Sequence, residues 1–407
     1  MNQVANVEIT QSATPTLSAL PLRLADFDSL ASALDYAAQG ESGTNFYSGS
    51  GKLATVLPYF MLREQAQTLA KRLLSFPLER GARVAIVAET NPDFLRFFFA
   101  CQYAGLVPVA LPAVIHVGGH KAYVNQLNGL LKGCRASLAV SSSQLLPFLT
   151  EAAEGLGLQF VNAASAFDEL PLKDITLQPS GPTETAYLQY TSGSTGFPRG
   201  VIITQESVMA NLLASGHGLD VRPEDRLVSW LPFYHDMGLV GCLLAPMATQ
   251  RSIDYLDTRD FAMRPRRWLE LLSSSRGTIS FSPPFGYALC VRCLRPEDIA
   301  QYDLSAWRVA GIGAEPIHVE STDRFCELLA PAGFNPKSFV PSYGMAETSL
   351  ALSFAPLGTG VVVDWLDGDD LADNLVATKV SPNTGSSFVR CGPILPKHEV
   401  LILDEQG

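Results

Sequence analysis

The amino-acid sequence predicts a large α/β protein in which helices cover mostly parallel sheets. Two observations lead to this prediction. Helical patterns alternate with short apolar strand patterns through the first 150 residues, as expected where a helix returns the chain to the next parallel strand. Further along, glycine-rich and polar segments follow several strand patterns, and open α/β sheets bind ligands beyond the carboxyl ends of their strands.

Hydrophobic periodicity predicts the first elements in order. They are a helix over 59–74, a strand over 83–87, a helix over 94–104, a strand over 107–111, a strand over 136–140 and a helix over 144–151. Segment 97–117 carries no formal charge, yet Gly105, Pro108 and Pro112 interrupt it. A membrane-spanning helix needs an unbroken apolar run, so we expect a helix followed by a strand and no transmembrane segment.

Residues 190–200, YTSGSTGFPRG, join a strand pattern over 186–190 to another over 200–203, and a helical pattern over 206–213 follows. Successive amide groups in a glycine-rich turn form a nest for anions, and the hydroxyls add neutral donors. The guanidinium of Arg199 suits phosphate. A P-loop would open a helix with Gly-Lys-Ser/Thr, which this segment does not do. We therefore expect a phosphate-binding loop of another fold; the alternative is a plain surface turn.

Two further motifs follow in order, LPFYHDMGL at 231–239 and SYGMAET at 342–348. With the loop at 190–200, they resemble the three motifs of the adenylate-forming superfamily, which includes acyl-CoA ligases, luciferases and the adenylation domains of peptide synthetases. The resemblance extends from about residue 26 to residue 407. It implies a multi-layer α/β domain with two helix-covered sheets and a small β-barrel subdomain.

The resemblance also implies a domain organisation. Residues 1–407 correspond to the large N-terminal adenylation domain, with α/β subdomains at about 1–180 and 181–335 and a β-rich subdomain with an insertion at 336–407. The C-terminal lid and its catalytic lysine are expected to be absent from this chain. Because that lysine stabilises charge on the α-phosphate, we expect this chain to form adenylate slowly.

The resemblance assigns ATP binding to the phosphate loop, to a segment after a strand pattern at 307–310, and to the third motif. These residues are Thr191, Ser192, Gly193, Ser194, Thr195, Gly196, Gly313, Ala314, Glu315, Pro316, Ser342, Tyr343, Gly344, Met345 and Thr348. Arg199 stands where the family has a lysine. Glu347 is the expected Mg²⁺ ligand with help from Thr191, since Mg²⁺ takes few protein carboxylates beside phosphate and water. The alternatives are a solvated Glu347 and a buried aromatic Tyr343.

For the acid substrate, the resemblance points to the histidine motif and to a segment near 281–286. The expected residues are His235, Asp236, Met237, Gly238, Phe281, Phe285 and Gly286. His235, Arg199 and Glu347 are the expected catalytic residues. A lone histidine in an apolar segment is often a core residue, and Asp236 either orients the imidazole or caps a helix. The family's usual asparagine is replaced in SPPFG at 282–286, which leaves a short, branched or aryl acid open.

The residues of the histidine motif and the long segment 353–390 resemble the corresponding parts of fatty acyl-AMP ligases. These use ATP and Mg²⁺ to convert a fatty acid to an acyl-adenylate and pyrophosphate, and pass the acyl group to an acyl carrier protein. The segment 353–390 resembles the insertion that restrains their mobile lid. The alternatives are an acyl- or aryl-CoA ligase of the same fold, and a nucleotide- or acyl-binding module without turnover.

Composition narrows the function classes. The net charge of −11 argues against a nucleic-acid partner, because such binding depends on neutralising phosphates. Seven scattered cysteines fit reduced thiols in the cytoplasm. Cys290 and Cys293 form a lone Cys-x-x-Cys, which is more typical of helix-borne core thiols than of a metal or redox site. The N-terminal 24 residues lack the pattern of a signal peptide.

Overall fold

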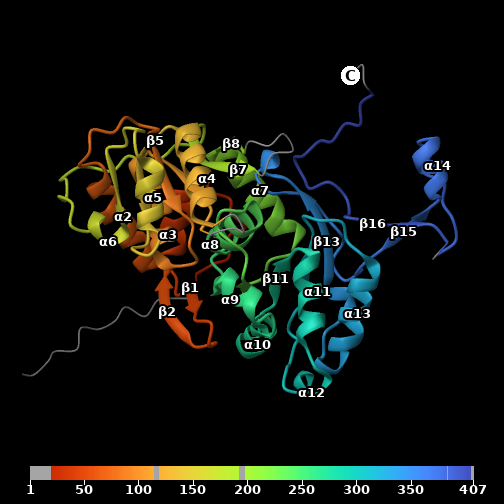
Figure 1. Cartoon of the computed structure of the whole chain (residues 1–407). Coiled ribbons are helices and arrows are strands. Elements are labelled where there is room, and N and C mark those ends of the chain that lie inside the picture. Colours follow the sequence, from red (N-terminus) through yellow and green to blue (C-terminus); the bar gives the residue numbers. More distant parts are fainter. Residues whose placement is uncertain (1–19, 114–118, 192–197, 383, 405–407) are drawn as a thin grey trace, which may run out of the picture.

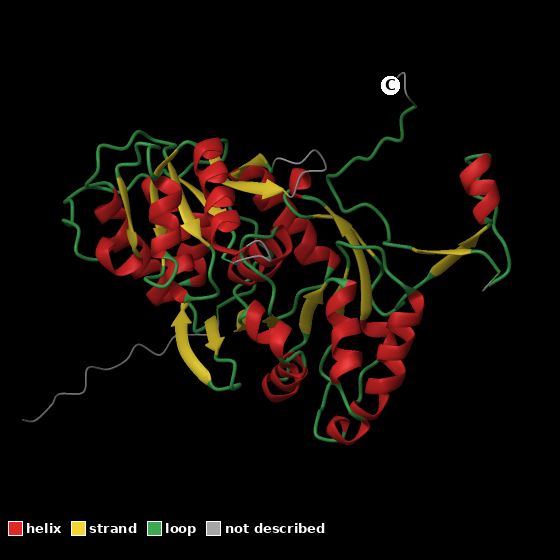
Figure 2. Cartoon of the chain, viewed as in Figure 1, coloured by secondary structure: helices red, strands yellow, loops and turns green. Residues whose placement is uncertain are grey.

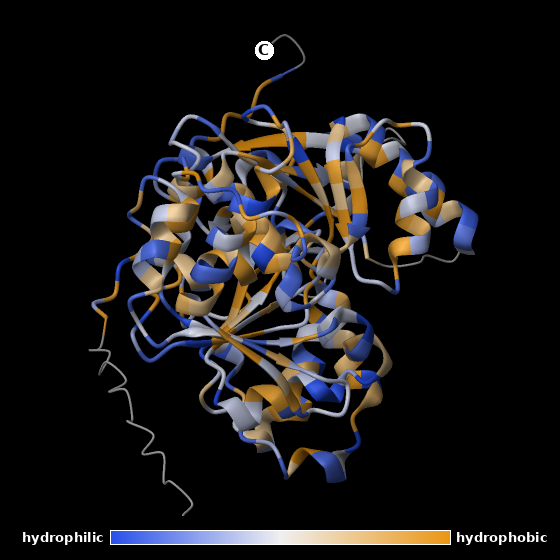
Figure 3. Ribbon diagram, turned by 90° about the vertical axis from the view of Figure 1, so that its left-hand side faces the viewer, coloured by the Kyte–Doolittle hydropathy of each residue, from blue (hydrophilic) through white to orange (hydrophobic). Residues whose placement is uncertain are grey.

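A computed structural model describes residues 20–113, 119–191, 198–382 and 384–404. These residues build one six-stranded sheet, one eight-stranded sheet and a separate two-stranded sheet (Figures 1 and 2). The predicted α/β class is therefore confirmed. In Figure 3 the strands of both large sheets are largely hydrophobic, while hydrophilic residues concentrate on helices and loops.

The six-stranded sheet has the order β6-β5-β3-β4-β7-β8, and only its edge pair β7–β8 is antiparallel. Its strands are β3 (Arg83–Val87), β4 (Val107–Leu111), β5 (Ala136–Ser141), β6 (Phe160–Ala163), β7 (Thr185–Thr191) and β8 (Arg199–Thr204). Side chains alternate along β3: Val84 and Ile86 enter one hydrophobic core, whereas Ala85 and Val87 enter another. Helices therefore cover both faces of this sheet, as its apolar strands require.

The helices on the two faces of the six-stranded sheet belong to different cores. Helices α2 (Tyr59–Leu73) and α3 (Pro92–Ala104) contribute to the larger core, and α4 (Gly119–Cys134) and α5 (Leu146–Ala153) to the smaller one. The predicted helix and strand across 94–111 are confirmed as α3 and β4. No described helix is long and apolar enough to cross a lipid bilayer.

The eight-stranded sheet has the order β14-β13-β12-β11-β9-β10-β1-β2, parallel except at its two outermost pairs. Its strands are β1 (Gly43–Tyr47), β2 (Leu53–Pro58), β9 (Arg226–Ser229), β10 (Ser252–Leu256), β11 (Ile279–Ser282), β12 (Val309–Ile312), β13 (Phe339–Gly344) and β14 (Ala351–Phe354). The helices that accompany it are α7 (Gln205–Gly218), η1 (Met237–Leu244), α8 (Ala245–Ala248), α9 (Thr258–Met263), α10 (Arg266–Ser275), α11 (Pro284–Cys293) and α13 (Val319–Leu329).

Shorter helices complete the described chain. They are α1 (Leu30–Ala37), α6 (Ala164–Phe167), α12 (Pro296–Ile299), α14 (Gly368–Asp373) and the 3-10 turns η2 (Ala330–Ala332), η3 (Pro336–Ser338) and η4 (Ala346–Thr348). Aromatic rings join α10, α11 and α13 into one core. The Trp268 ring lies 5.3 Å from that of Tyr287 and 5.2 Å from that of Trp307, and Tyr287 lies 5.1 Å from Phe325. All seven cysteines are free; Cys290 is buried and Cys293 exposed, in line with a core thiol on a helix.

Each of the two large sheets contains strands from both sides of residue 180, where the subdomain boundary is predicted. Strands β7 and β8 extend the first sheet, and β1 and β2, which come early in the sequence, belong to the second. The expected β-barrel is also not what the described residues after 336 form. There β13 and β14 join the eight-stranded sheet, and β15 (Val363–Leu366) pairs only with β16 (Ser386–Val389). These pairings connect residues far apart in sequence, which local patterns cannot specify.

The pair β15–β16 and helix α14 project from the body of the protein (Figure 1). Ionic contacts hold the two strands together: Arg390 donates two hydrogen bonds of 2.7 Å to Asp364, and Lys379 lies 3.0 Å from the same carboxylate. These elements occupy the segment 353–390 that the sequence singled out as an insertion. Its role toward a lid stays a prediction.

Candidate active site

The predicted site motifs follow the carboxyl ends of neighbouring strands. His235 follows β9, Gly313 follows β12 and Glu347 follows β13, and these strands run parallel in one sheet. Parallel strands end at the same edge, so the three segments meet there. Thr191, at the end of β7 in the other sheet, also lies near these segments. It lines one cavity together with His235 and Glu347.

The two ends of the predicted phosphate loop are held by strand pairing. Thr191 and Arg199 lie opposite each other in the antiparallel pair β7–β8. The hydroxyl of Tyr190 donates to the carbonyl of Leu130 at 3.0 Å, which ties β7 to helix α4. The predicted ATP-binding residues Ser192, Gly193, Ser194, Thr195 and Gly196 lie outside the described residues, so their role stays a prediction.

Two cavities meet at His235 and Asp236. The first encloses about 210 Å³ and has a mainly apolar wall. The second encloses about 530 Å³ and has Thr191, Arg199 and Glu347 in its wall. His235 and Asp236 belong to the walls of both. A molecule with an apolar part and an anionic part could therefore bridge the two spaces at these side chains.

Asp236 orients the imidazole and also caps a helix, so both alternatives from the sequence hold. His235 Nδ1 lies 2.7 Å from Asp236 Oδ1. The same oxygen accepts a hydrogen bond of 2.7 Å from the amide of Met237, at the start of the π-helix η1. The hydrogen bond to Asp236 raises the pKa of His235 and outweighs burial, which lowers it. Since 52% of the His235 side chain is exposed, it is not a core residue.

The remaining predicted acyl residues separate into two groups. Met237 and Phe281 line the apolar cavity. Phe285 and Gly286 line neither that cavity nor the polar one; Phe285 instead lies 5.6 Å from the ring of Trp230 and is 48% exposed. Gly238 has a packing role, because a Cβ there would lie 2.1 Å from the carbonyl oxygen of Pro232.

The predicted adenine segments also divide. Ala314, Ser342, Tyr343 and Gly344 line the apolar cavity, and Met345 lines the polar one. Tyr343 is 53% exposed, so it is not a buried aromatic. Ala314 has a φ of 68°, a left-handed conformation that non-glycine residues adopt at a cost and that often marks functional sites.

Three residues of the predicted segment 313–316 lie outside the cavity walls. Glu315 and Pro316 line neither cavity. A Cβ on Gly313 would lie 2.4 Å from the carbonyl oxygen of Ser342, so this glycine allows the ends of β12 and β13 to approach closely. The contact of these three residues with adenine stays a prediction.

A buried asparagine holds the turn that carries Glu347. Asn211 Nδ2 donates to the carbonyls of Thr348 at 3.0 Å and Ala351 at 2.7 Å, and its Oδ1 accepts from the amide of Ala351. Thr348 does not line a cavity; its hydroxyl donates to the carbonyl of Met345 within the same turn. Glu347 is exposed on the polar cavity with Thr191 and Arg199. Nothing in the sequence singles out Asn211, because it is an asparagine inside a helix and belongs to no recognisable motif.

The donor set fits a magnesium ion that arrives with a nucleotide. Among the described residues, no three His, Cys, Asp or Glu side chains gather into a metal site. One carboxylate and one hydroxyl, from Glu347 and Thr191, face the same cavity. Mg²⁺ completes its octahedron with phosphate oxygens and waters rather than with a full protein cage.

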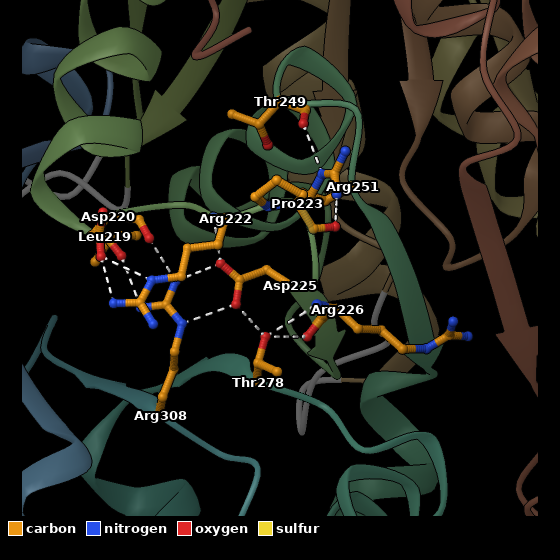
Figure 4. Close-up of polar contacts among 10 residues, drawn as sticks. All are labelled: Leu219, Asp220, Arg222, Pro223, Asp225, Arg226, Thr249, Arg251, Thr278 and Arg308. Atoms are coloured by element: carbon orange, nitrogen blue, oxygen red, sulfur yellow. Dashed lines mark hydrogen bonds and ion pairs between the residues drawn. The ribbon is translucent and has the colours of Figure 1, made fainter. Parts of the chain in front are cut away.

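Helix α7 supplies a wall of the apolar cavity that sequence analysis did not assign. Leu212, Ser215 and Leu219 line it, at the three- and four-residue spacing that places side chains on one helix face. This spacing is the feature of the sequence that could have indicated a common helix face. The end of α7 is anchored in turn: Arg308 donates to the carbonyls of Leu219 at 3.1 Å and Asp220 at 2.8 Å (Figure 4).

Arg308, which holds the end of α7, also forms a buried ion pair with Asp225. The side chain of Asp225 is fully buried; it accepts 2.7 Å hydrogen bonds from Thr278 Oγ1 and the Arg222 amide, and it pairs with Arg308 (Figure 4). Burial raises the pKa of this carboxyl, but the hydrogen bonds from Arg308 and Thr278 outweigh it and leave the pKa below its usual range. The wall formed by α7 is therefore fixed to the base of the eight-stranded sheet.

Comparison with protein families agrees with this arrangement. The model of the AMP-binding enzyme family matches residues 38–407. The chain belongs to this family. The predicted membership of the adenylate-forming superfamily is thereby confirmed.

Individual relatives of this AMP-binding enzyme cover most of its length. A putative acyl-CoA synthetase of Caulobacter vibrioides is 42% identical over 398 residues, which are 97% of this chain and 69% of the relative. A medium-chain-fatty-acid–[acyl-carrier-protein] ligase of Moorena producens is 30% identical over 93% of this chain and 65% of the relative. A structure from a study of fatty acyl-adenylate ligases from E. coli and L. pneumophila has a TM-score of 0.92 at 50% identity, covering 95% of this chain and 70% of that one.

The AMP-binding enzyme thus closely matches a fatty acyl-adenylate ligase in structure, and its similar curated relatives include ligases of fatty acids. It spans 65 to 70% of the lengths of these three proteins.

Proposed function

We propose that this protein activates a carboxylic acid, most simply a fatty acid, with ATP to give an acyl-adenylate and pyrophosphate, for transfer to an acyl carrier protein. The observation that carries the proposal is the position of His235 and Asp236 in the walls of both cavities. An acyl chain in the apolar cavity would end at the imidazole, where the polar cavity begins. The carboxylate and the α-phosphate would then meet beside His235.

Each residue has a distinct part in this reaction. The acid's carboxylate oxygen attacks the α-phosphorus, and the bond to the bridging oxygen of pyrophosphate breaks. His235, whose pKa Asp236 raises, donates a charge-assisted hydrogen bond that holds the carboxylate in line. Arg199 faces the phosphates and offsets the charge that develops on the leaving pyrophosphate. When bound, Mg²⁺ neutralises phosphate charge, and Glu347 with Thr191 would hold it.

The acceptor separates the leading proposal from a second candidate. The ligase of Moorena producens uses an acyl carrier protein according to its name, whereas the relative from Caulobacter vibrioides is described as a putative acyl-CoA synthetase. The similarity of the latter favours coenzyme A as the alternative acceptor. We further propose a cytoplasmic setting, because all seven cysteines are free thiols, as is usual in a reducing compartment.

ATP–pyrophosphate exchange with a panel of fatty, branched and aryl acids tests the activity directly. We expect acid-dependent exchange, strongest with a fatty acid, and acyl transfer to a carrier protein when carrier protein and coenzyme A are offered in parallel. Acid-independent exchange, or none with any acid, contradicts adenylate formation. A thioester formed only on coenzyme A contradicts the proposed acceptor.

The metal site is tested by Glu347→Gln in the same exchange reaction. Loss of a full carboxylate charge should raise the Mg²⁺ concentration for half-maximal exchange about tenfold or more. Glu64→Gln, on the exposed side of α2, is the matched control and should leave the Mg²⁺ titration unchanged. An unchanged titration for the Glu347 variant would remove this residue from the metal site.

A further inference from the structure

The wall of the apolar cavity contains one polar side chain that lies outside the motifs proposed to bind the carboxylate and the nucleotide. Five polar residues contribute to this wall: Ser215, His235, Asp236, Ser342 and Tyr343. Four of them come from the His235 motif and the end of β13, where the carboxylate and the nucleotide are proposed to meet. Ser215 instead lies on α7 between Leu212 and Leu219, which line the same cavity.

The hydroxyl of Ser215 has no hydrogen-bond partner in the described part of the chain. The residue is only 6% exposed. A buried serine inside a helix ordinarily bonds the carbonyl one turn earlier, and a buried polar group left unpaired costs free energy. Alanine would avoid that cost and has a higher helix propensity. The fold therefore gives no reason for a hydroxyl at this position.

Nothing local fixes the direction of this hydroxyl. The Ser215 oxygen is buried in its present position and has no bond to protein. A serine side chain has three staggered positions about its Cα–Cβ bond, so rotation about that bond can turn the oxygen toward the cavity. The helix itself cannot easily shift to bury the group differently, because Arg308 holds the carbonyls of Leu219 and Asp220 (Figure 4). Ser215 therefore lies in a wall whose position is fixed.

We propose that the acid bound here carries an oxygen substituent, a hydroxyl or an oxo group, along its chain, and that Ser215 Oγ hydrogen-bonds to it. This inference rests on the proposed function. A serine hydroxyl both donates and accepts, so it pairs with either substituent. The apolar neighbours Leu212 and Leu219 hold the methylene groups on each side. Ser215 is then a specificity-determining residue rather than a catalytic one.

The consequence is a preference for the oxygenated acid over the plain acid, which a purely apolar cavity would not show. An apolar wall discriminates weakly between a chain and its hydroxylated analogue, whereas a wall that bonds the oxygen loses a buried partner when the oxygen is missing. We expect the protein to favour the matching hydroxy acid over the plain acid of equal length by about 5- to 20-fold. Ser215→Ala should remove that preference.

Binding of non-reactive adenylates tests this independently of turnover. The probes are sulfamoyl-adenosine analogues of decanoic acid and of decanoic acids hydroxylated or oxidised to ketones at carbons 3, 6 and 9, with dissociation constants from calorimetry on the present chain. Ser215→Ala is compared with Ser321→Ala, a helix serine of α13 outside the cavity. The expected result is tighter binding of at least one oxygenated probe to the parent protein and to Ser321→Ala, and no preference in Ser215→Ala.

The outcomes separate the two proposals. If all probes bind equally to the parent protein, or if Ser215→Ala keeps the preference, the role of Ser215 is overturned while the adenylate site stands. If no probe binds, the adenylate site is refuted, and the inference falls with it. The alanine variant is expected to fold, because the exchange favours the helix, and circular dichroism checks this.

Discussion

The imidazole of His235 is bonded to Asp236 on one side and about half exposed to the cavities on the other. That geometry favours the protonated ring, because the carboxylate accepts from Nδ1 while Nε2 stays available for a substrate oxygen. A carboxylate substrate benefits most from this positive charge. The residue therefore links substrate binding to pH through a single proton.

We expect acid binding to persist below the raised pKa of His235 and to decline as pH rises through it. In Asp236→Asn the amide cannot raise that pKa as the carboxylate does, so the decline should move to lower pH. Asparagine still caps η1. The measurement is the pH dependence of exchange or of acid affinity.

His217→Ala, an exposed histidine in the last turn of α7, is the control and should leave the profile in place. The same sign applies to stability. A histidine whose pKa is raised by folding stabilises the protein below its unfolded pKa, and this contribution disappears as pH rises through the folded pKa. An unchanged profile in Asp236→Asn would show that His235 is not the titrating group.

At the scale of elements, the π-helix η1 directly follows His235 and Asp236. Wide turns of this kind are rare and occur often at functional sites. Gly238, in its first turn, lies against the carbonyl of Pro232, in the loop that leads to His235. The helix and the loop that leads to His235 therefore approach as closely as two backbones allow.

Gly238→Ala should force this contact apart. A Cβ 2.1 Å from the Pro232 oxygen cannot be accommodated without backbone movement, so the free energy of unfolding should fall by about 1–3 kcal/mol, with a loss of exchange activity. In α4, Gly129→Ala has nothing within 4 Å of the new Cβ and should raise it by up to about 1 kcal/mol. Urea denaturation measures both, and equal effects would contradict the packing argument.

At the scale of the whole molecule, the sequence predicted what contiguous residues determine. The motifs that hold His235 and Glu347 lie in single short segments, so their chemistry and their order were visible. The strand β1 could not be placed, since its Asn45 pairs with Asp254, 209 residues away. The α7 wall and Asn211 were missed for the same reason: each acquires its role only through a distant partner.

The base of the eight-stranded sheet is a further long-range feature, and it holds the end of α7, whose residues line the apolar cavity. Asp225 is wholly buried and paired with Arg308, which also holds the end of α7 (Figure 4). Removing one partner from a buried pair leaves the other uncompensated. Arg308→Met should therefore lower the free energy of unfolding by about 3–5 kcal/mol.

The exposed pair of Arg276 and Asp303, 70% and 56% exposed, is the comparison. Arg276→Met should lower the free energy of unfolding far less than Arg308→Met does, because solvent screens an exposed pair. Asp225→Asn combined with Arg308→Met should cost less than the two single changes added together, because the two groups interact. Additive losses would show that the pair is not coupled.

The pair of Asp225 and Arg308 should also affect how stability falls at acid pH. The lowered pKa of Asp225 stabilises the fold above the unfolded pKa, and the contribution is lost as pH falls through the folded value. Without Arg308, only the hydrogen bonds from Thr278 and the Arg222 amide oppose the effect of burial, so the pKa of Asp225 rises. Arg308→Met should therefore begin to lose stability at a higher pH than the parent protein. Thermal unfolding from pH 7 to pH 3 measures this, and parallel curves would contradict it. A loosened α7 should also weaken any preference set by Ser215, since the wall that presents its hydroxyl depends on the same arginine.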